Sequence, residues 1–364
     1  MSGHRRRVVV GLSGGVDSAV AAAELLEQGW EVTGLFMKNW EEDDDADYCA
    51  AAEDLADAEA VCATLGIELE TVNFAHEYWE RVFASFLDEY RRGRTPNPDI
   101  LCNREIKFRE FLQRALKLGA DCIATGHYAR LQRSDGGVRL CKGADPGKDQ
   151  TYFLHTVPQA ALAKTLFPIG HLRKAEVRRK ALDLGLPVHD KKDSTGICFI
   201  GERRFREFLA RYLPTRRGDI RTLQDEVIGE HQGAAYYTIG QRHGLGIGGA
   251  AAGSGEPWFV CAKDSARNIL YVVQGHDHPA LLKTAVFTEP LHWISGHAPE
   301  LPTNCRAKTR YRQTEQPCRI AEIGNDGARV EFATPQRAVT PGQSIVFYQG
   351  EVCLGGGVIC GTAD

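Results

Sequence analysis

Residues 8–20 read VVVGLSGGVDSAV and are the most informative part of the chain. Three consecutive valines indicate a short buried strand, and the alanine-rich run after Ser18 indicates a helix, so residues 13–18 form the loop between them. Such a loop binds anions, because its glycines let backbone N–H groups approach a phosphate and the helix N-terminus adds about half a positive charge. Ser13 and Ser18 can donate hydroxyl hydrogen bonds, and Asp17 could hold Mg²⁺ on the phosphates.

A glycine turn with a serine or aspartate that caps the helix is the ordinary alternative for this loop. The whole run from Ser13 to Ser18, in a strand-to-helix context, favours phosphate binding over that alternative. The loop lacks the lysine of the Gly-x-x-x-x-Gly-Lys-[Ser/Thr] motif, which argues against a Walker-type γ-phosphate site.

The alternation of short strands and helices continues along the first half of the chain. Strand-like runs are expected at 8–12, 31–36, 67–74 and 121–124, and helix-like runs at 19–28, 50–65, 76–91, 106–118, 172–184 and 205–212. This pattern predicts an α/β fold, with a doubly wound, mostly parallel sheet that has helices on both faces. Ligands of such sheets bind beyond the carboxyl ends of the strands.

Beyond about residue 208 the sequence changes to short strand-like runs, glycines and turns. We expect a catalytic domain at 1–208, a small central β-rich domain at 209–283 and a C-terminal β-barrel at 284–364.

The composition fits a globular protein with more than one core, at 364 residues, 43% hydrophobic and 25% charged. No apolar run approaches the ~20 residues that span a bilayer, and the basic start does not resemble a signal peptide, so we expect a cytoplasmic protein without a membrane partner. Eleven cysteines without Cys-x-x-Cys spacing fit a reducing compartment and give a structural zinc site little support.

Charge is placed unevenly along a chain whose formal net charge is −4. Residues 41–59 hold ten acidic side chains and no Lys or Arg, whereas residues 171–217 hold thirteen basic against six acidic side chains. This segregation permits a nucleic-acid face on an acidic protein, and it equally fits two solvated helix faces.

Two further segments carry cysteines with chemical potential. In TPNPDILCN, residues 95–103, two prolines stiffen a loop that brings Asp99 and Cys102 to a helix start, where the helix end and Arg104 would favour a thiolate. DSTGICFI, residues 193–200, carries Cys198 at 96 positions beyond Cys102. Taken singly, Asp99 could be a helix cap and either cysteine a buried thiol.

With these segments the chain resembles the tRNA-specific 2-thiouridylase (MnmA) family of the N-type, or PP-loop, ATP pyrophosphatases, which split ATP into AMP and pyrophosphate. The matching segments are residues 11–18, 95–108, 124–130, 148–154, 193–200 and 237–242. The resemblance implies ATP and Mg²⁺ as cofactors, with Asp17 as a candidate metal ligand. The implied ATP-binding residues are Gly11, Leu12, Ser13, Gly14, Gly15, Val16, Asp17, Ser18, Met37 and Gly126.

The resemblance also implies a tRNA uridine 2-sulfurtransferase. ATP would adenylate the C2 carbonyl of the wobble uridine (U34), and sulfur from a persulfide on Cys198 would replace AMP. Cys102 would release the sulfur and end in a disulfide with Cys198, and Asp99 would act as an acid or base. The implied partners are tRNAs of the Lys, Glu and Gln types and a persulfide-donating sulfur-relay protein. The residues implied to hold the target base or tRNA are Asn97, Pro98, Asp99, His127, Lys148, Asp149, Gln150, Arg310, Tyr311 and Gln343.

Basic residues alternate in CRAKTRYR, residues 305–312. Arg306, Lys308, Arg310 and Arg312 are therefore expected on one face of a strand. That face is either a solubilising surface or, beside the family resemblance, a row of phosphate contacts.

Two other functions remain open at this point. One is an ATP pyrophosphatase that joins an adenylated substrate to an amine, which would need no sulfur-carrying cysteine. The other is a tRNA-binding protein with a vestigial nucleotide loop, against which the intact Ser13–Ser18 run argues.

Overall fold

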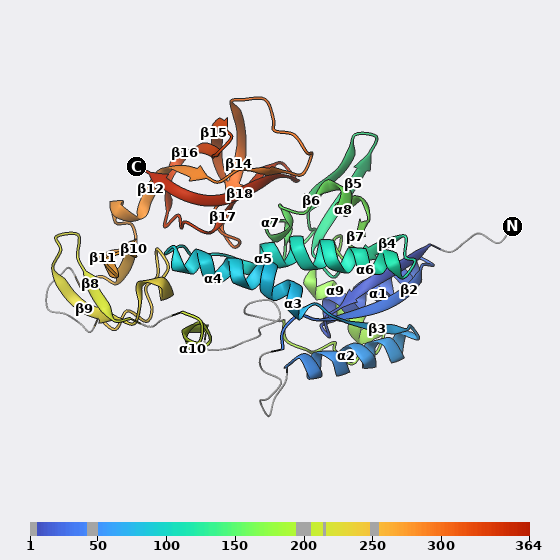
Figure 1. The fold of residues 1–364 in the computed structure, drawn as a ribbon. Helices are drawn as coiled ribbons and strands as arrows, with labels where there is room; N and C mark the ends of the chain where they lie inside the picture. Colours follow the sequence, from blue (N-terminus) through green and yellow to red (C-terminus); the bar gives the residue numbers. More distant parts are fainter. Residues whose placement is uncertain (1–5, 42–49, 194–204, 214–215, 248–254) are drawn as a thin grey trace.

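The structure is a computed structural model that describes residues 6–41, 50–193, 205–213, 216–247 and 255–364. An α/β sheet lies at one end of the molecule and a small β-sheet at the other, with a β-barrel between them (Figure 1). Cys198 lies in residues 194–204, which are outside the described residues.

The N-terminal sheet is parallel throughout and has the strand order β3-β2-β1-β4-β7. Its strands and their main helices are β1 (Arg7–Leu12), α1 (Val16–Glu27), β2 (Glu31–Lys38), α2 (Ala50–Leu65), β3 (Leu69–Asn73), β4 (Cys122–Ala124), β7 (Thr165–Leu166) and α9 (Lys174–Asp183).

Side chains of β1 alternate between two cores because successive residues of a strand point to opposite faces. Val9 packs in a core with the helical segments that precede β4. Val8 and Val10 pack on the other face with residues of α1 and α2. The predicted doubly wound, mostly parallel sheet with helices on both faces is therefore confirmed.

A long helical path crosses the centre of the molecule below the barrel (Figure 1). It contains two π-helical segments, η1 and η2, and an interruption before Pro98. Its parts are α3 (Ala75–Tyr78), η1 (Trp79–Phe83), α4 (Ala84–Arg91), α5 (Pro98–Leu101), η2 (Cys102–Glu110) and α6 (Phe111–Lys117).

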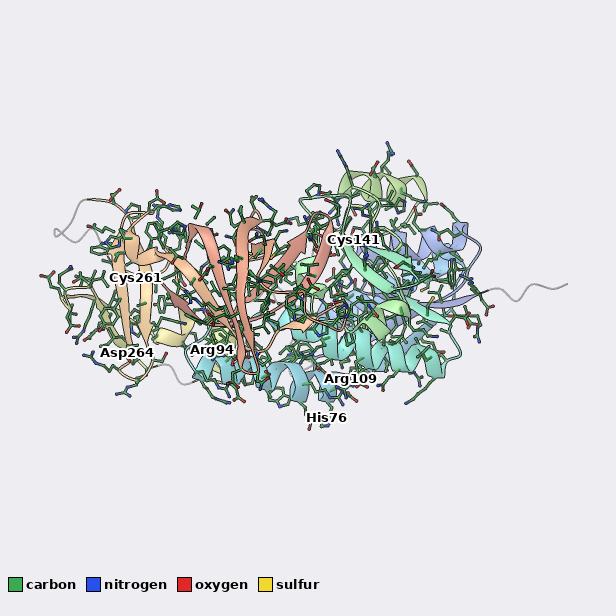
Figure 2. The ribbon with its side chains drawn as sticks, turned by 90° about the horizontal axis from the view of Figure 1, so that it is seen from above. His76, Arg94, Arg109, Cys141, Cys261 and Asp264 are labelled. Carbon is green, nitrogen blue, oxygen red and sulfur yellow. The ribbon has the colours of Figure 1, made fainter. Side chains whose placement is uncertain are left out.

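A hairpin of the N-terminal half joins the barrel sheet. Strands β5 (Ala129–Ser134) and β6 (Gly137–Lys142) pair with each other, and β6 pairs with β18 through Cys141 and Val352. Cys141 accordingly lies where the hairpin borders the barrel (Figure 2). The short helices α7 (Thr151–Leu154) and α8 (Gln159–Ala163) follow the hairpin.

The small β-sheet has the order β10-β11-β8-β9. Its region contains α10 (Phe205–Ala210), β8 (Gly218–Arg221), β9 (Val227–His231), η3 (Ala234–Tyr236), β10 (Trp258–Asp264), β11 (Ile269–Gln274) and η4 (Pro279–Leu281).

The C-terminal strands form an antiparallel barrel that closes by pairing of β12 with β18. This confirms the predicted β-rich centre and C-terminal barrel. The barrel contains β12 (Leu282–Thr288), β13 (His292–Trp293), β14 (Thr303–Lys308), β15 (Gln316–Gly324), β16 (Gly327–Arg337), β17 (Ser344–Gln349) and β18 (Val352–Ala363). Strand β12, the first strand of the barrel, begins at Leu282.

The predicted strand face of four alternating basic residues is wrong. Strand β14 ends at Lys308, and a turn follows in which the backbone N–H of Gln313 donates to the carbonyl of Arg310. The side chain of Gln313 ends the strand, because its Oε1 accepts from both the backbone N–H and the hydroxyl of Thr309. Arg310 and Arg312 therefore lie outside the strand.

Among the described residues, no helix has both the length and the apolar character needed to cross a membrane.

Candidate active site

The phosphate loop lies at the carboxyl end of β1. Gly15 is the N-cap residue of α1, and no side chain hydrogen-bonds the helix end from that position. The backbone N–H of Ser13 donates to Ser18 Oγ at 3.2 Å, and that hydroxyl donates to the carbonyl of Gly15 at 3.0 Å. Ser18 thus shapes the loop, and the helix end keeps backbone donors for an anion.

Two positions near the loop require glycine, because the backbone of another segment lies too close for a side chain. Gly14 has φ +69°, and a Cβ there would lie 2.4 Å from the carbonyl oxygen of Asp54. A Cβ on Gly126, just beyond β4, would lie 2.7 Å from the backbone of Asp17 and Ser18. Gly126 therefore makes room for the phosphate loop itself, whereas the sequence suggested room for a nucleotide.

The other predicted ATP-binding residues line the start of the loop. Met37 is buried at the end of β2, and its methyl carbon would lie 3.4 Å from a Cβ on Gly11. Leu12 and Val16 are buried in the cores on either side of the loop. Met37 and Gly11 are thus adjacent, as a shared role at the nucleotide would require.

Asp17 projects from the first turn of α1 and is already engaged by two partners. Lys174 Nζ lies 2.8 Å from both carboxylate oxygens, and the hydroxyl of Tyr128 donates to Oδ1 at 2.6 Å. Burial and the Asp17 carboxylate both raise the pKa of Tyr128, so its phenol stays protonated and donates.

Asp193 extends this ionic cluster. Its carboxylate accepts from Lys148 at 2.7 Å, and both Lys174 and Arg178 lie 2.8 Å from Oδ1. Partial burial opposes ionisation, but hydrogen bonds from Lys148 and Lys174 outweigh it and lower the pKa of Asp193. Asp193, the last described residue before Cys198, is thereby tied to the phosphate loop through Lys174.

The residues at the loop fit a magnesium ion that also binds phosphates. Mg²⁺ is usually held by one or two carboxylates together with substrate phosphates and water. Asp17 offers such a carboxylate, although both of its oxygens are hydrogen-bonded by Lys174. In the part of the chain that the structure describes, no three His, Cys, Asp or Glu side chains form a metal cage.

The segment with Asp99 and Cys102 begins a helix, as predicted. Asn97 is the N-cap of α5 and accepts from the backbone N–H of Asp99 at 3.1 Å, and Pro98 occupies the first helical turn. Cys102 is fully buried at the start of the π-helical segment η2. Arg104, the expected cationic neighbour, forms an ion pair with Glu105 at 2.8 Å, so its charge is shared.

The barrel supports this segment from outside. The side chain of Gln343 donates to the carbonyl of Thr95 at 2.8 Å, and the N–H of Thr95 donates to the carbonyl of Pro341. Gly342 has φ +94°, and a Cβ there would lie 2.7 Å from Thr95 N. Gln343 therefore fixes the loop that leads into Asn97.

Of the remaining predicted tRNA-binding residues, four lie beside the phosphate loop or the barrel. His127 is buried between Phe108 and Phe167, and burial followed by the Lys107 charge lowers its pKa, so the ring is neutral. Lys148 forms the ion pair with Asp193 described above. Asp149 is buried, and its carboxylate accepts from the Thr151 hydroxyl and the Gly143 N–H. The ammonium of Lys308 lies 3.6 Å from the same carboxylate. The side chain of Gln150 accepts from the backbone N–H of Tyr128.

Arg310 and Tyr311 lie in the turn after β14. The guanidinium of Arg310 donates to the carbonyls of Ile239 and Ala338, so it links the small β-sheet domain to the barrel. The ring of Tyr311 lies 4.4 Å from that of Phe153, whose carbonyl accepts from Asn103 beside Cys102. Tyr311 is thus brought close to the cysteine-bearing helix.

The sequence did not predict that Lys174 would contact Asp17 of the phosphate loop, and Tyr128 was not singled out. Lys174 is 157 positions from Asp17, so no local spacing connects them, and the basic tract of residues 171–217 was the one available signal. The β5–β6 hairpin was also missed, although Ser134-Asp135-Gly136-Gly137 is a recognisable turn sequence.

Comparison with known proteins identifies the family. A family model described as a tRNA methyl transferase HUP domain matches residues 6–202, one described as a tRNA methyl transferase PRC-barrel domain matches 206–274, and one described as an aminomethyltransferase beta-barrel domain matches 283–359.

The chain is similar over nearly its full length to curated proteins. It is 63% identical to the tRNA-specific 2-thiouridylase MnmA of Methylococcus capsulatus over 354 residues, which is 97% of this chain and 95% of the relative. The MnmA protein of Nitrosomonas europaea is 60% identical over 361 residues, 99% of this chain and 100% of the relative. A solved 4-thiouridine synthetase–RNA complex with bound ATP is 20% identical and matches 57% of this chain and 50% of its own chain, with a TM-score of 0.34. From the family models and the near full-length identity, the chain belongs to the tRNA-specific 2-thiouridylase (MnmA) family of the PP-loop superfamily.

Proposed function

We propose that the chain is an ATP-dependent tRNA uridine 2-sulfurtransferase that converts the wobble uridine (U34) into 2-thiouridine. The observation that carries the proposal is an intact phosphate loop, shaped by Gly14 and Gly126, in a chain that aligns almost end to end with relatives named tRNA-specific 2-thiouridylase.

The first step is adenylation of the uracil. The C2 carbonyl oxygen attacks the α-phosphorus of ATP, and the bond to the β-phosphate oxygen breaks, so pyrophosphate leaves with the electron pair. The backbone donors between Ser13 and Ser18 suit the phosphate oxygens. We propose that Met37 borders the nucleoside and that Gly126 contributes by leaving room for the phosphate loop. A Mg²⁺ held by Asp17 would neutralise charge on the phosphates.

The second step exchanges oxygen for sulfur. The terminal sulfur of a Cys198 persulfide attacks C2, and AMP leaves with the original oxygen. The Cys102 thiolate then attacks the Cys198 sulfur, which leaves the terminal sulfur on C2 and a Cys102–Cys198 disulfide for a thiol to reduce. Asp99, one turn before Cys102 on the same helical path, is proposed as the acid or base.

The residues that would bind the substrate are inferred from family resemblance and from their positions. We propose that Asn97–Asp99, His127 and Lys148–Gln150 hold the target base and its strand, and that Arg310, Tyr311 and Gln343 contact the tRNA. The preferred tRNAs would be of the Lys, Glu and Gln types, and a persulfide-donating sulfur-relay protein would load Cys198. We further propose a cytoplasmic location and domains at 1–208, 209–283 and 284–364.

The proposal is tested by product analysis. Wild-type protein, ATP, Mg²⁺, a persulfide donor and tRNA with a wobble uridine should give AMP and 2-thiouridine. Mass spectrometry of the nucleosides separates exchange of oxygen for sulfur from addition of a methyl group, which is the alternative suggested by the family-model descriptions.

Variants separate the sulfur chemistry from the nucleotide chemistry. Cys198→Ser should abolish thiolation but leave ATP binding intact, whereas Asp17→Asn should weaken both adenylation and thiolation. Retained thiolation by Cys198→Ser would overturn the assignment. AMP formation that does not depend on RNA would favour an amide-forming ATP pyrophosphatase instead.

A further inference from the structure

The phosphate loop contains no lysine of its own, but the fold brings one to it. Lys174 is the first residue of α9, and its Nζ lies 2.8 Å from both oxygens of Asp17. Its side chain is only 12% exposed, so the ammonium group is largely removed from bulk water at the loop. A cation in that environment interacts strongly with any anion that enters.

Helices α1 and α9 deliver this lysine by running parallel. Lys174 contacts Asp17 at the start of both helices, and Lys180 contacts Glu24 and Glu27 further along both. The two N-termini therefore meet at the same end of the helix pair. Because helix N-termini carry partial positive charge, the N-terminus of α1 favours an anion beside Lys174, whereas that of α9 already takes the carboxylates of Asp145 and Glu176.

Carboxylates hold Lys174 in position at the loop. Lys148, Lys174 and Arg178 share the carboxylates of Asp17 and Asp193, and Asp145 Oδ2 accepts from the backbone N–H of Lys174 at 3.0 Å. The ammonium of Lys174 is thereby fixed beside the phosphate loop.

We propose that Lys174 binds the pyrophosphate part of ATP and stabilises the pyrophosphate that leaves during adenylation. This inference rests on the proposed function. When the α–β phosphoanhydride bond breaks, the electron pair goes to the β-phosphate oxygen, and the Lys174 ammonium donates a hydrogen bond to the charge that develops there. Lys174 thereby supplies from α9 the cation that a Walker-type loop carries within its own sequence.

The decisive measurement compares pyrophosphate with AMP. Lys174→Met should weaken binding of inorganic pyrophosphate at least about tenfold, measured by calorimetry and as product inhibition, because a charge-assisted hydrogen bond is lost. Binding of AMP, which lacks the β- and γ-phosphates, should stay unchanged. The adenylation rate at saturating ATP should fall by about 10²-fold.

Lys180→Met is the matched control. It removes a lysine from the same helix that also bridges α9 to α1, but at the far end from the loop, so pyrophosphate binding and adenylation should match wild type. Lys174→Arg should restore part of the pyrophosphate affinity. Lys174→Gln serves as a second neutral variant if Lys174→Met does not fold.

The outcomes separate the two proposals. Wild-type pyrophosphate affinity in folded Lys174→Met or Lys174→Gln overturns the role of Lys174, whatever the substrate is. Equal loss of AMP and pyrophosphate binding also overturns it, because it indicates general damage to the loop. If wild-type protein binds pyrophosphate through Lys174 but does not thiolate tRNA, the proposed function fails and this inference stands.

Discussion

Replacement of Gly126 by alanine tests how closely the phosphate loop depends on its neighbour. A Cβ at Gly126 would lie 2.7 Å from the carbonyl carbon of Asp17 and 2.7 Å from the N of Ser18. Both are backbone atoms, so ordinary contact at 3.4 Å requires a backbone shift of about 0.7 Å. The backbone of Gly126 does not have a left-handed φ, so the perturbation is steric.

The expected magnitude follows from this displacement. Overpacking costs about 1–3 kcal/mol of unfolding free energy, and a misplacement of about 1 Å at a reacting centre can lower a rate about 10²-fold. We therefore expect kcat/KM for ATP to fall at least about tenfold in Gly126→Ala.

The assay is AMP formation at varied ATP, together with urea unfolding. Gly229→Ala is the control, because a Cβ there would meet its nearest atom, Ile247 Cγ1, at an ordinary 3.6 Å. Wild-type ATP kinetics in Gly126→Ala, or equal damage in Gly229→Ala, would refute the reasoning.

Three further predictions concern other parts of the molecule. Burial lowers the pKa of His155 to about 4, whereas the unfolded ring binds a proton near its usual pKa of 6.5. The free energy of unfolding should therefore fall by up to about 3 kcal/mol as the pH is lowered from 6.5 to 4. Urea titrations should show a weaker pH dependence in His155→Gln, and an unchanged slope contradicts the idea. Gln343→Ala removes the bond to Thr95 and should slow thiolation several-fold at unchanged ATP affinity, whereas weakened ATP binding would count against a local role. Cys305 and Cys318 are directly paired across β14 and β15 with their sulfurs 3.6 Å apart, so hydrogen peroxide should link them with release of water; peptide mass mapping checks this, and full alkylation of both after oxidation excludes it.

Local patterns were sufficient where each signal is contained in neighbouring residues. The helix predicted at 50–65 is observed as α2 (Ala50–Leu65), and β1 was predicted to within one residue of its observed start at Arg7. Helix α2 buries one stripe of its surface, and strand β1 buries both of its faces. The spacing of their hydrophobic residues therefore determines their conformation. The phosphate loop was recognised for the same reason, because all of its residues are consecutive.

Features that depend on distant contacts could not be predicted in this way. The basic residues of 305–312 alternate as a strand would, but the Gln313 side chain satisfies Thr309 and ends the strand. Gly126 was predicted beside the nucleotide, but its close contact with the backbone of the phosphate loop could not be read from the sequence. In each case the deciding partner is a side chain or backbone that strand and helix periodicity do not specify.

The barrel contributes to the site as a support for the segment that leads to Cys102. Thr95 is held from both sides by the turn at Pro341 and Gln343, and Gly342 leaves no space for a side chain between them. Arg94 strengthens the same junction through an ion pair with Glu289 of the barrel at 2.5 Å, and it lies where α4 approaches the barrel strands (Figure 2). Because Pro96 and Pro98 stiffen the intervening loop, a constraint on Thr95 is transmitted to the helix start at Asn97. A tRNA that binds the barrel would therefore act on a surface that is joined directly to the helix that carries Asp99 and Cys102.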